Sequence, residues 1–160
     1  MVISLDSIPD IDAKPDAYAK HYGIFKNMAE YVDGNYTENS SRTFIGRGSE
    51  SGIVLMSLLL EMGEDATFDN FIATDPGGGY KTALIKLLEV EDIPRSKTEK
   101  KLHFSFSATN TRDKCTRIYD LITELNDPRL QMTLNEYAEN DYEHTYQISF
   151  AEGLKYIFNE

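Results

Sequence analysis

The feature that most constrains the fold is the segment at residues 52–62, GIVLMSLLLEM, which carries apolar side chains on nearly every face of a helix. A surface helix has a single apolar stripe, so a helix that is apolar all round is expected to be buried on all sides. Short apolar segments at residues 43–46 and 70–74 flank it and are typical of strands. A buried helix between two strands predicts a parallel sheet packed against helices.

The same alternation of strand and helix runs through the rest of the chain. Further strands are predicted at 2–5, 101–107 and 130–134, and further helical patterns at 16–33, around Leu84 to Leu88, at 118–125 and at 148–158. This order predicts one α/β domain over residues 1–160, with a mostly parallel sheet and helices on both faces. Such folds bind ligands at the carboxyl ends of the strands, so the loops at 46–51, 74–79, 107–113 and 137–145 are expected to share one rim.

The charge balance of the chain excludes several classes of partner. The formal net charge is −11, from 16 basic and 27 acidic residues, and such a surface repels nucleic-acid phosphates and anionic membranes. No apolar stretch approaches the roughly 18 residues that a membrane span needs. The first residues have no basic region and contain Asp6, so they do not resemble a secretory signal, and a cytoplasmic location is the default expectation.

The sequence contains little that would hold a metal or a cofactor. Cys115 is the single cysteine, which excludes an internal disulfide and a multi-cysteine zinc site. The three histidines lack close ligand spacing. Residues 77–82, GGGYKT, fail as a phosphate-binding loop because Tyr80 separates the glycines from the lysine, so these glycines are expected only to turn the chain. We predict no cofactor and no metal.

Three segments at the predicted rim resemble one known family, the esterases related to esterase D and the enterochelin esterases. Residues 26–60 resemble the family's helix, nucleophile strand and following apolar helix. Residues 65–76 resemble the next segment, and residues 130–158 resemble the last strand, the histidine loop and the final helix. The resemblance covers residues 16–160 and implies the C-terminal half of an α/β-hydrolase domain, that is, a truncated three-layer sandwich.

The resemblance implies a G-x-S-x-G nucleophile elbow between residues 43–46 and the apolar helix. In such an elbow a strained turn lifts a serine above the sheet, beside backbone N–H groups that bind the oxyanion. Placing the pattern without gaps puts Gly48 at the nucleophile, and a shift of two residues puts Glu50 there. Neither frame supplies a serine, although Ser49 and Ser51 lie beside the position.

The resemblance also implies a catalytic histidine and a carboxylate. His144, just before the final helix, lies where the family's histidine belongs. Asp113 is the candidate acid after residues 101–107, with the alternative that it is an N-terminal helix residue stabilised by the helix dipole. A working triad needs the histidine as base and the acid to orient it.

These features leave three hypotheses. The first is a catalytically degenerate hydrolase fold that acts as a binding or interaction module. The second is an active carboxyl-ester hydrolase that uses Ser49 or Ser51 with His144 on a small-molecule ester. The third is a fragment of a longer protein. Without the first half of the family's sheet, the strand at 43–46 becomes an edge unless residues 2–5 cover it, so we expect a homodimer or a partner chain near that edge.

Overall fold

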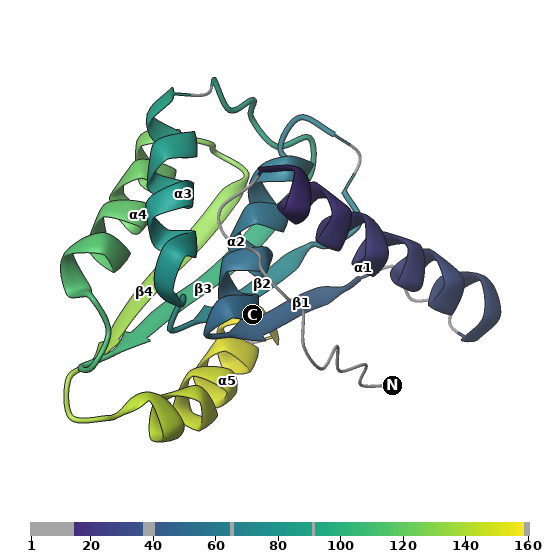
Figure 1. Cartoon of the computed structure of the whole chain (residues 1–160). Coiled ribbons are helices and arrows are strands. Elements are labelled where there is room, and N and C mark those ends of the chain that lie inside the picture. The colour runs from purple at the N-terminus through teal and green to yellow at the C-terminus, as the bar shows by residue number, and fades with distance from the viewer. Residues whose placement is uncertain (1–14, 37–40, 65, 91, 159–160) are drawn as a thin grey trace.

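The computed structural model describes residues 15–36, 41–64, 66–90 and 92–158, and strands and helices alternate along them (Figure 1). The elements are α1 (Pro15–Tyr36), β1 (Thr43–Arg47), α2 (Ser49–Glu61), β2 (Asn70–Thr74), α3 (Gly78–Val90), β3 (Lys100–Ser107), α4 (Arg112–Glu124), β4 (Leu130–Tyr137) and α5 (Tyr142–Phe158). The predicted strand at 2–5 lies outside the described residues. The other predicted strands and helices are confirmed.

The four strands form one sheet in the order β1-β2-β3-β4, and every neighbouring pair is parallel. Gly46 of β1 stands opposite Ala73 of β2, and Ala73 stands opposite Phe104 of β3. Because the strands share a direction and a close register, their carboxyl ends meet at one edge of the sheet. The predicted α/β class with a parallel sheet is therefore confirmed.

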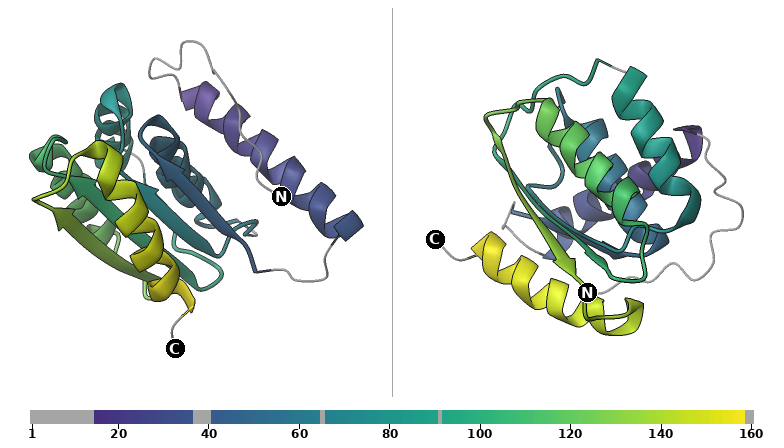
Figure 2. Two further views of the ribbon diagram at one scale, coloured as in Figure 1. Left: turned by 90° about the horizontal axis from the view of Figure 1, so that it is seen from below. Right: turned by 90° about the vertical axis from the view of Figure 1, so that its left-hand side faces the viewer.

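Helices cover both faces of the sheet and make three layers (Figure 2). On one face α2 packs against β1 and β2, α3 and α4 lie beside it, and α1 packs on the outer side of α2. On the opposite face α5 lies across β2 and β3. Among the described residues β1 pairs with β2 alone, so β1 is an edge strand of the sheet.

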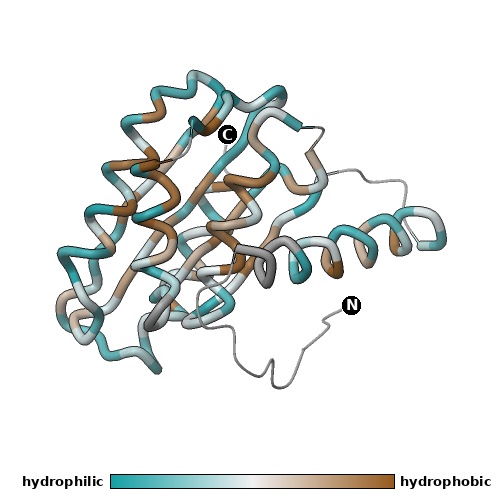
Figure 3. Tube along the Cα trace, turned by 45° about the horizontal axis from the view of Figure 1, so that its top comes forward, coloured by the Kyte–Doolittle hydropathy of each residue, from teal (hydrophilic) through white to brown (hydrophobic). Residues whose placement is uncertain are grey.

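The core lies between the sheet and α2, and the trace of Figure 3 is most hydrophobic there. Val54, Leu55 and Leu58 of α2 are fully buried, which confirms the predicted buried helix, although Leu60 near its end is 37% exposed. At about 1.5–3 kcal/mol for each large apolar side chain removed from water, α2 is a main source of stability. Cys115 is also buried in this core, and burial raises the pKa of its thiol to about 12.

Helix α5 approaches the sheet closely, and this sets the position of its first turn. A Cβ atom on Gly153 would stand 2.9 Å from Ile72 and 3.0 Å from the ring of His103, so a side chain at 153 would push the helix away. One turn earlier, the buried Ser149 hydroxyl lies 2.6 Å from the hydroxyls of Thr74 and Ser105. These contacts hold the first turn of α5 at the carboxyl edge of the sheet.

Among the described residues, no helix has the length and apolarity required to span a bilayer. The same residues contain no group of three or more histidine, cysteine or acidic side chains arranged to hold a metal ion.

Candidate functional site

The turn between β1 and α2 has the geometry that a nucleophile elbow requires. Gly48 is the single residue between the strand and the helix, and its backbone has φ 58° and ψ −125°. A side chain is strained in this conformation, and glycine adopts it freely. At Gly46 a Cβ atom would stand 2.7 Å from the Glu50 carbonyl, so the tight strand-to-helix turn also needs a glycine there. The turn therefore requires glycine at both positions. Helix α2 begins at Ser49, three residues before the predicted start at residue 52.

Backbone hydrogen bonds hold this turn against the end of β2. The Gly48 N–H donates to the Thr74 carbonyl, and the Gly48 carbonyl accepts from the Gly77 N–H, each over 2.9 Å. A Cβ atom on Gly77 would stand 3.2 Å from the Ser49 nitrogen, so the chain after β2 passes close to the start of α2. Gly77 thus turns the chain, as predicted, while Gly78 and Gly79 already belong to α3.

The hydroxyl of Tyr142 occupies the place next to the turn where a side chain on Gly48 would stand. A Cβ atom on Gly48 would lie 2.5 Å from the Tyr142 hydroxyl oxygen, which is far inside van der Waals contact. Tyr142 begins α5, and the Arg47 guanidinium lies 5.2 Å from its ring centre and 4.5 Å from that of Tyr146. Burial raises the pKa of Tyr142, so its hydroxyl keeps its proton at neutral pH.

Asp75 follows β2 directly and brings a buried carboxylate to the same edge. It has φ 52°, in the left-handed region, and is 2% exposed. Its Oδ1 accepts from the Ser107 N–H over 2.7 Å, from the Ser107 hydroxyl over 3.0 Å and from Asn110 Nδ2 over 2.9 Å. Its Oδ2 is buried and has no hydrogen-bond partner among the residues that the structure describes. An unusual backbone conformation and an unsatisfied buried oxygen are both more common at functional sites than elsewhere.

Lys81, on the second turn of α3, brings a buried ammonium to this group. It is 5% exposed, and its Nζ donates to Asn110 Oδ1. Burial lowers the pKa of Lys81, with a smaller opposing effect from Asp75. Asn110 therefore links the two charges, because its oxygen binds the ammonium while its nitrogen binds the carboxylate.

A cavity of about 460 Å³ lies among these groups. Its lining includes Gly48, Asp75, Lys81, Asn110 and Tyr142. They come from the turn after β1, the segment after β2, α3, the loop after β3 and the start of α5. Apart from α3, these segments belong to the loops that the sequence predicted to share one rim.

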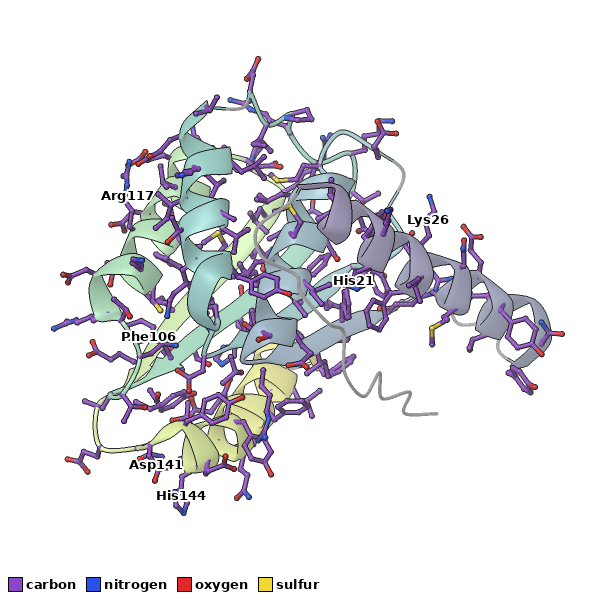
Figure 4. All side chains as sticks on the ribbon, viewed as in Figure 1. His21, Lys26, Phe106, Arg117, Asp141 and His144 are labelled. Atoms are coloured by element: carbon purple, nitrogen blue, oxygen red, sulfur yellow. The ribbon has the colours of Figure 1, made fainter. Side chains whose placement is uncertain are left out.

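The sequence-predicted residues are not brought together as a triad. His144 is exposed, and its Nδ1 lies 2.7 Å from Asp141 on the same first turn of α5 (Figure 4). Ser49 is exposed at the start of α2 and lines the cavity. Ser51 is fully buried, and no described residue is a partner for its hydroxyl. Asp113 is an exposed residue in the first turn of α4, where its charge favours the helix dipole.

Sequence patterns did not single out Asp75, Lys81 or Tyr142 as site residues. One signal was available for Asp75, since the resembling family has serine-proline at the end of this strand and the chain has Asp75-Pro76. Lys81 appeared only within the rejected phosphate loop. Tyr142 lies two residues before His144, the expected histidine, on the same turn of α5. The Tyr142 side chain lines the cavity, whereas that of His144 is exposed to solvent.

The comparisons with known proteins place the chain by its fold. No family model and no curated protein sequence matches it. The BES protein from Bacillus cereus superposes with a TM-score of 0.58 at 17% identity, over 98% of this chain and 62% of that protein. The siderophore hydrolase EstA from Aspergillus nidulans has a TM-score of 0.61 at 14% identity, over 96% of this chain and 63% of that protein.

A third similar structure is a variant of SOBER1 from Arabidopsis thaliana, with a TM-score of 0.57 at 10% identity, over 93% of this chain and 74% of that protein. The chain thus spans less than two thirds of the BES and EstA structures. At these identities the likeness establishes the fold alone, which is a parallel sheet with helices on both faces.

Proposed function

We propose that this chain is a catalytically degenerate member of the α/β-hydrolase fold that uses the remaining cleft to bind a ligand. The observation that carries the proposal is the turn at Gly48, which has the strained backbone of a nucleophile elbow and no side chain. The Tyr142 hydroxyl fills the space beside it. A protonated phenol at this point is a poor nucleophile and can act as a hydrogen-bonding group.

The surroundings of the turn support the same conclusion. Ester hydrolysis by this fold needs a hydroxyl at the elbow, a histidine that removes its proton and an acid that orients the histidine. His144 is held instead by Asp141, at the exposed start of α5. The position after β2 carries the buried Asp75, whose charge beside the elbow would oppose a developing oxyanion.

The experiment that tests the proposal is hydrolysis of p-nitrophenyl acetate and p-nitrophenyl butyrate. We expect a rate equal to that of the heat-denatured protein, and no change in Ser49→Ala, Ser51→Ala or His144→Ala. Gln147→Ala, an exposed residue of the next turn of α5, is the matched control for His144. Turnover that disappears in Ser49→Ala, Ser51→Ala or His144→Ala, and persists in Gln147→Ala, would establish an active esterase.

We further propose that the chain self-associates, or binds a partner chain, through the edge of β1. The edge position of β1 in the described sheet supports this, since an unpaired strand edge is a template for pairing. Light scattering at micromolar concentration should give a mass above that of the monomer, and Ile45→Lys at a half-buried position of β1 should lower it. A monomeric mass for the unaltered chain would contradict this proposal.

A further inference from the structure

The cavity at the carboxyl edge of the sheet has the dimensions of a small-molecule site. Its volume is about 460 Å³, within the range of roughly 300–1,000 Å³ that is typical for such sites. Its wall includes two buried charged side chains, Asp75 and Lys81, whereas most cavity walls are apolar. The chemistry of a ligand can therefore be inferred from the hydrogen-bonding groups that remain unused in this wall.

The first unused group is the Oδ2 atom of Asp75. Within the described part of the chain, the three donors that reach this carboxylate all bind Oδ1, and Oδ2 is left buried without a partner. A buried acceptor with no partner costs roughly 1–3 kcal/mol of desolvation, and more when it is charged. Asp75 lines the cavity, but Oδ2 itself has almost no exposed surface, so the carboxylate must turn slightly to meet a ligand. A ligand hydroxyl that then donates a hydrogen bond to Oδ2 would remove this cost.

The second unused group is the ammonium of Lys81. An ammonium has three donors, and the hydrogen bond that this one makes within the described chain is to Asn110 Oδ1. Asn110 has no capacity left for a ligand, because its oxygen also accepts from the Thr111 N–H and its nitrogen donates to Asp75 and to the Pro76 carbonyl. The remaining donors of Lys81 are thus available to an acceptor on the ligand.

The charge of the site decides between the possible ligand classes. The charges of the Asp75 carboxylate and the Lys81 ammonium cancel, so the site has no net charge. An anionic ligand would be repelled by Asp75, and a cationic ligand would be repelled by Lys81. The chain as a whole carries −11, which further disfavours an anion. A neutral ligand with adjacent hydroxyls meets both demands, since one hydroxyl donates to Asp75 while its neighbour accepts from Lys81.

We propose that this cavity binds a neutral polyhydroxyl compound, such as a cyclic polyol or a sugar, through two adjacent hydroxyls held between Asp75 Oδ2 and Lys81 Nζ. The Tyr142 hydroxyl, which lines the same cavity, is a third polar group for the ligand. This inference rests on the proposed function, because it treats the cleft as a binding site.

The test is a titration of the ¹⁵N-labelled full chain followed by amide chemical shifts. The Ser107 and Thr111 amides report on the site, because they donate to the Asp75 and Asn110 side chains. The probes are myo-inositol and methyl α-D-glucopyranoside, with cyclohexanol as the ring that has one hydroxyl, putrescine as a cation and succinate as an anion. Maltotriose distinguishes a sugar within an oligosaccharide from a free polyol.

Four variants connect the binding to the two charges. Lys81→Met removes the donors and should weaken binding of myo-inositol about tenfold or more, the effect of losing a hydrogen bond to a charged group. Asp75→Asn keeps an oxygen that accepts from Ser107 and should weaken the binding of myo-inositol less than Lys81→Met does. A ligand hydroxyl that donates to the carboxylate can instead accept from the amide nitrogen of the asparagine. Lys86→Met and Asp120→Asn, at exposed positions of α3 and α4, should leave binding unchanged. The same spectra show whether each variant is folded.

Saturable shifts of both amides with the polyols, absent with cyclohexanol and weakened by Lys81→Met, would support the proposal. No saturable shift, an equal response to cyclohexanol, binding of putrescine or succinate alone, or an unchanged Lys81→Met would overturn it. If the chain neither hydrolyses p-nitrophenyl esters nor binds the polyols, the inference of polyol binding is wrong, but the proposed function is not contradicted. Serine- and histidine-dependent ester turnover would remove the proposed function, whatever the polyols do.

Discussion

Both ends of the sheet bury a carboxylate and a lysine, but the two pairs are completed in different ways. At the amino end Glu61 and Lys100 are 0% and 1% exposed, and they contact each other over 2.9 Å. At the carboxyl end Asp75 and Lys81 are also buried, but Lys81 binds Asn110, and one oxygen of Asp75 has no partner in the described segments. Similar residues at similar depth thus make a closed pair at one end and an open pair at the other.

In the closed pair, both oxygens of Glu61 and the ammonium of Lys100 have hydrogen-bond partners within the fold. Glu61 accepts from the Tyr22 hydroxyl and from the Thr67 and Phe68 N–H groups, and Lys100 also donates to the Phe68 carbonyl. Burying charges is costly unless such partners are present. The difference teaches that burial alone does not mark a site, because a satisfied pair is part of the scaffold and an unsatisfied pair beside a cavity is available to a ligand.

The largest effect is expected on breaking the closed pair with Lys100→Met. Removing one partner leaves the Glu61 charge buried without its counterion, so the free energy of unfolding should fall by about 3–5 kcal/mol. Urea denaturation followed by circular dichroism measures this, with Lys86→Met as the exposed control. A loss of unfolding free energy below about 1 kcal/mol in Lys100→Met would contradict the conclusion that Glu61 and Lys100 form a closed pair.

A smaller loss is expected at the open end from Gly48→Ala. The new Cβ would adopt φ 58° and press on the Tyr142 hydroxyl, so we expect a loss of about 1–3 kcal/mol in unfolding free energy. Combining it with Tyr142→Ala removes the collision and leaves the backbone strain. Non-additive losses in this double-mutant cycle would confirm that the two residues share one space, and additive losses would contradict it.

Lys81→Met should change stability by less than about 1 kcal/mol, in either direction. The ammonium is buried with one hydrogen bond from the protein, so its removal also removes a desolvation cost. Residues placed for a ligand often contribute little to stability. The same urea experiment compares it with Lys100→Met, and equal losses in the two variants would abolish the distinction between open and closed pairs.

The last effect appears only at alkaline pH and concerns the closed network. Burial, opposed by Thr67 and reinforced by Glu61, raises the pKa of Tyr22 from about 10 to about 12. A raised folded-state pKa stabilises the protein below pH 10, and this contribution is lost as the pH rises from 10 to 12. Tyr22→Phe should flatten this part of the profile of unfolding free energy against pH, whereas Phe at the exposed Tyr31 should not. An unchanged slope in Tyr22→Phe would remove Tyr22 from the network.

The sequence predicted the scaffold well, because patterns of apolar residues depend on local spacing. The buried segment at 52–62, the alternating residues at 101–107 and the periodic helices all follow from that spacing, and the parallel order follows from their alternation. The frame that puts Gly48 at the nucleophile position agrees with its backbone angles. Whether Ser49, His144 and Asp113 have any role stays a prediction; of the three, Ser49 lines the cavity.

The sequence by itself determined the strand-helix order, the buried helix α2 and the absence of a serine in register at the elbow. Only the tertiary structure decided that Tyr142, and not His144, reaches that elbow, because the direction of a side chain on the first turn of α5 depends on how α5 packs on the sheet. It also decided which of two buried carboxylates is satisfied. Hydrogen-bond partners of Asp75 and Glu61 come from residues 32–35 and 6–39 positions away in the chain, and spacing along a sequence does not record such contacts.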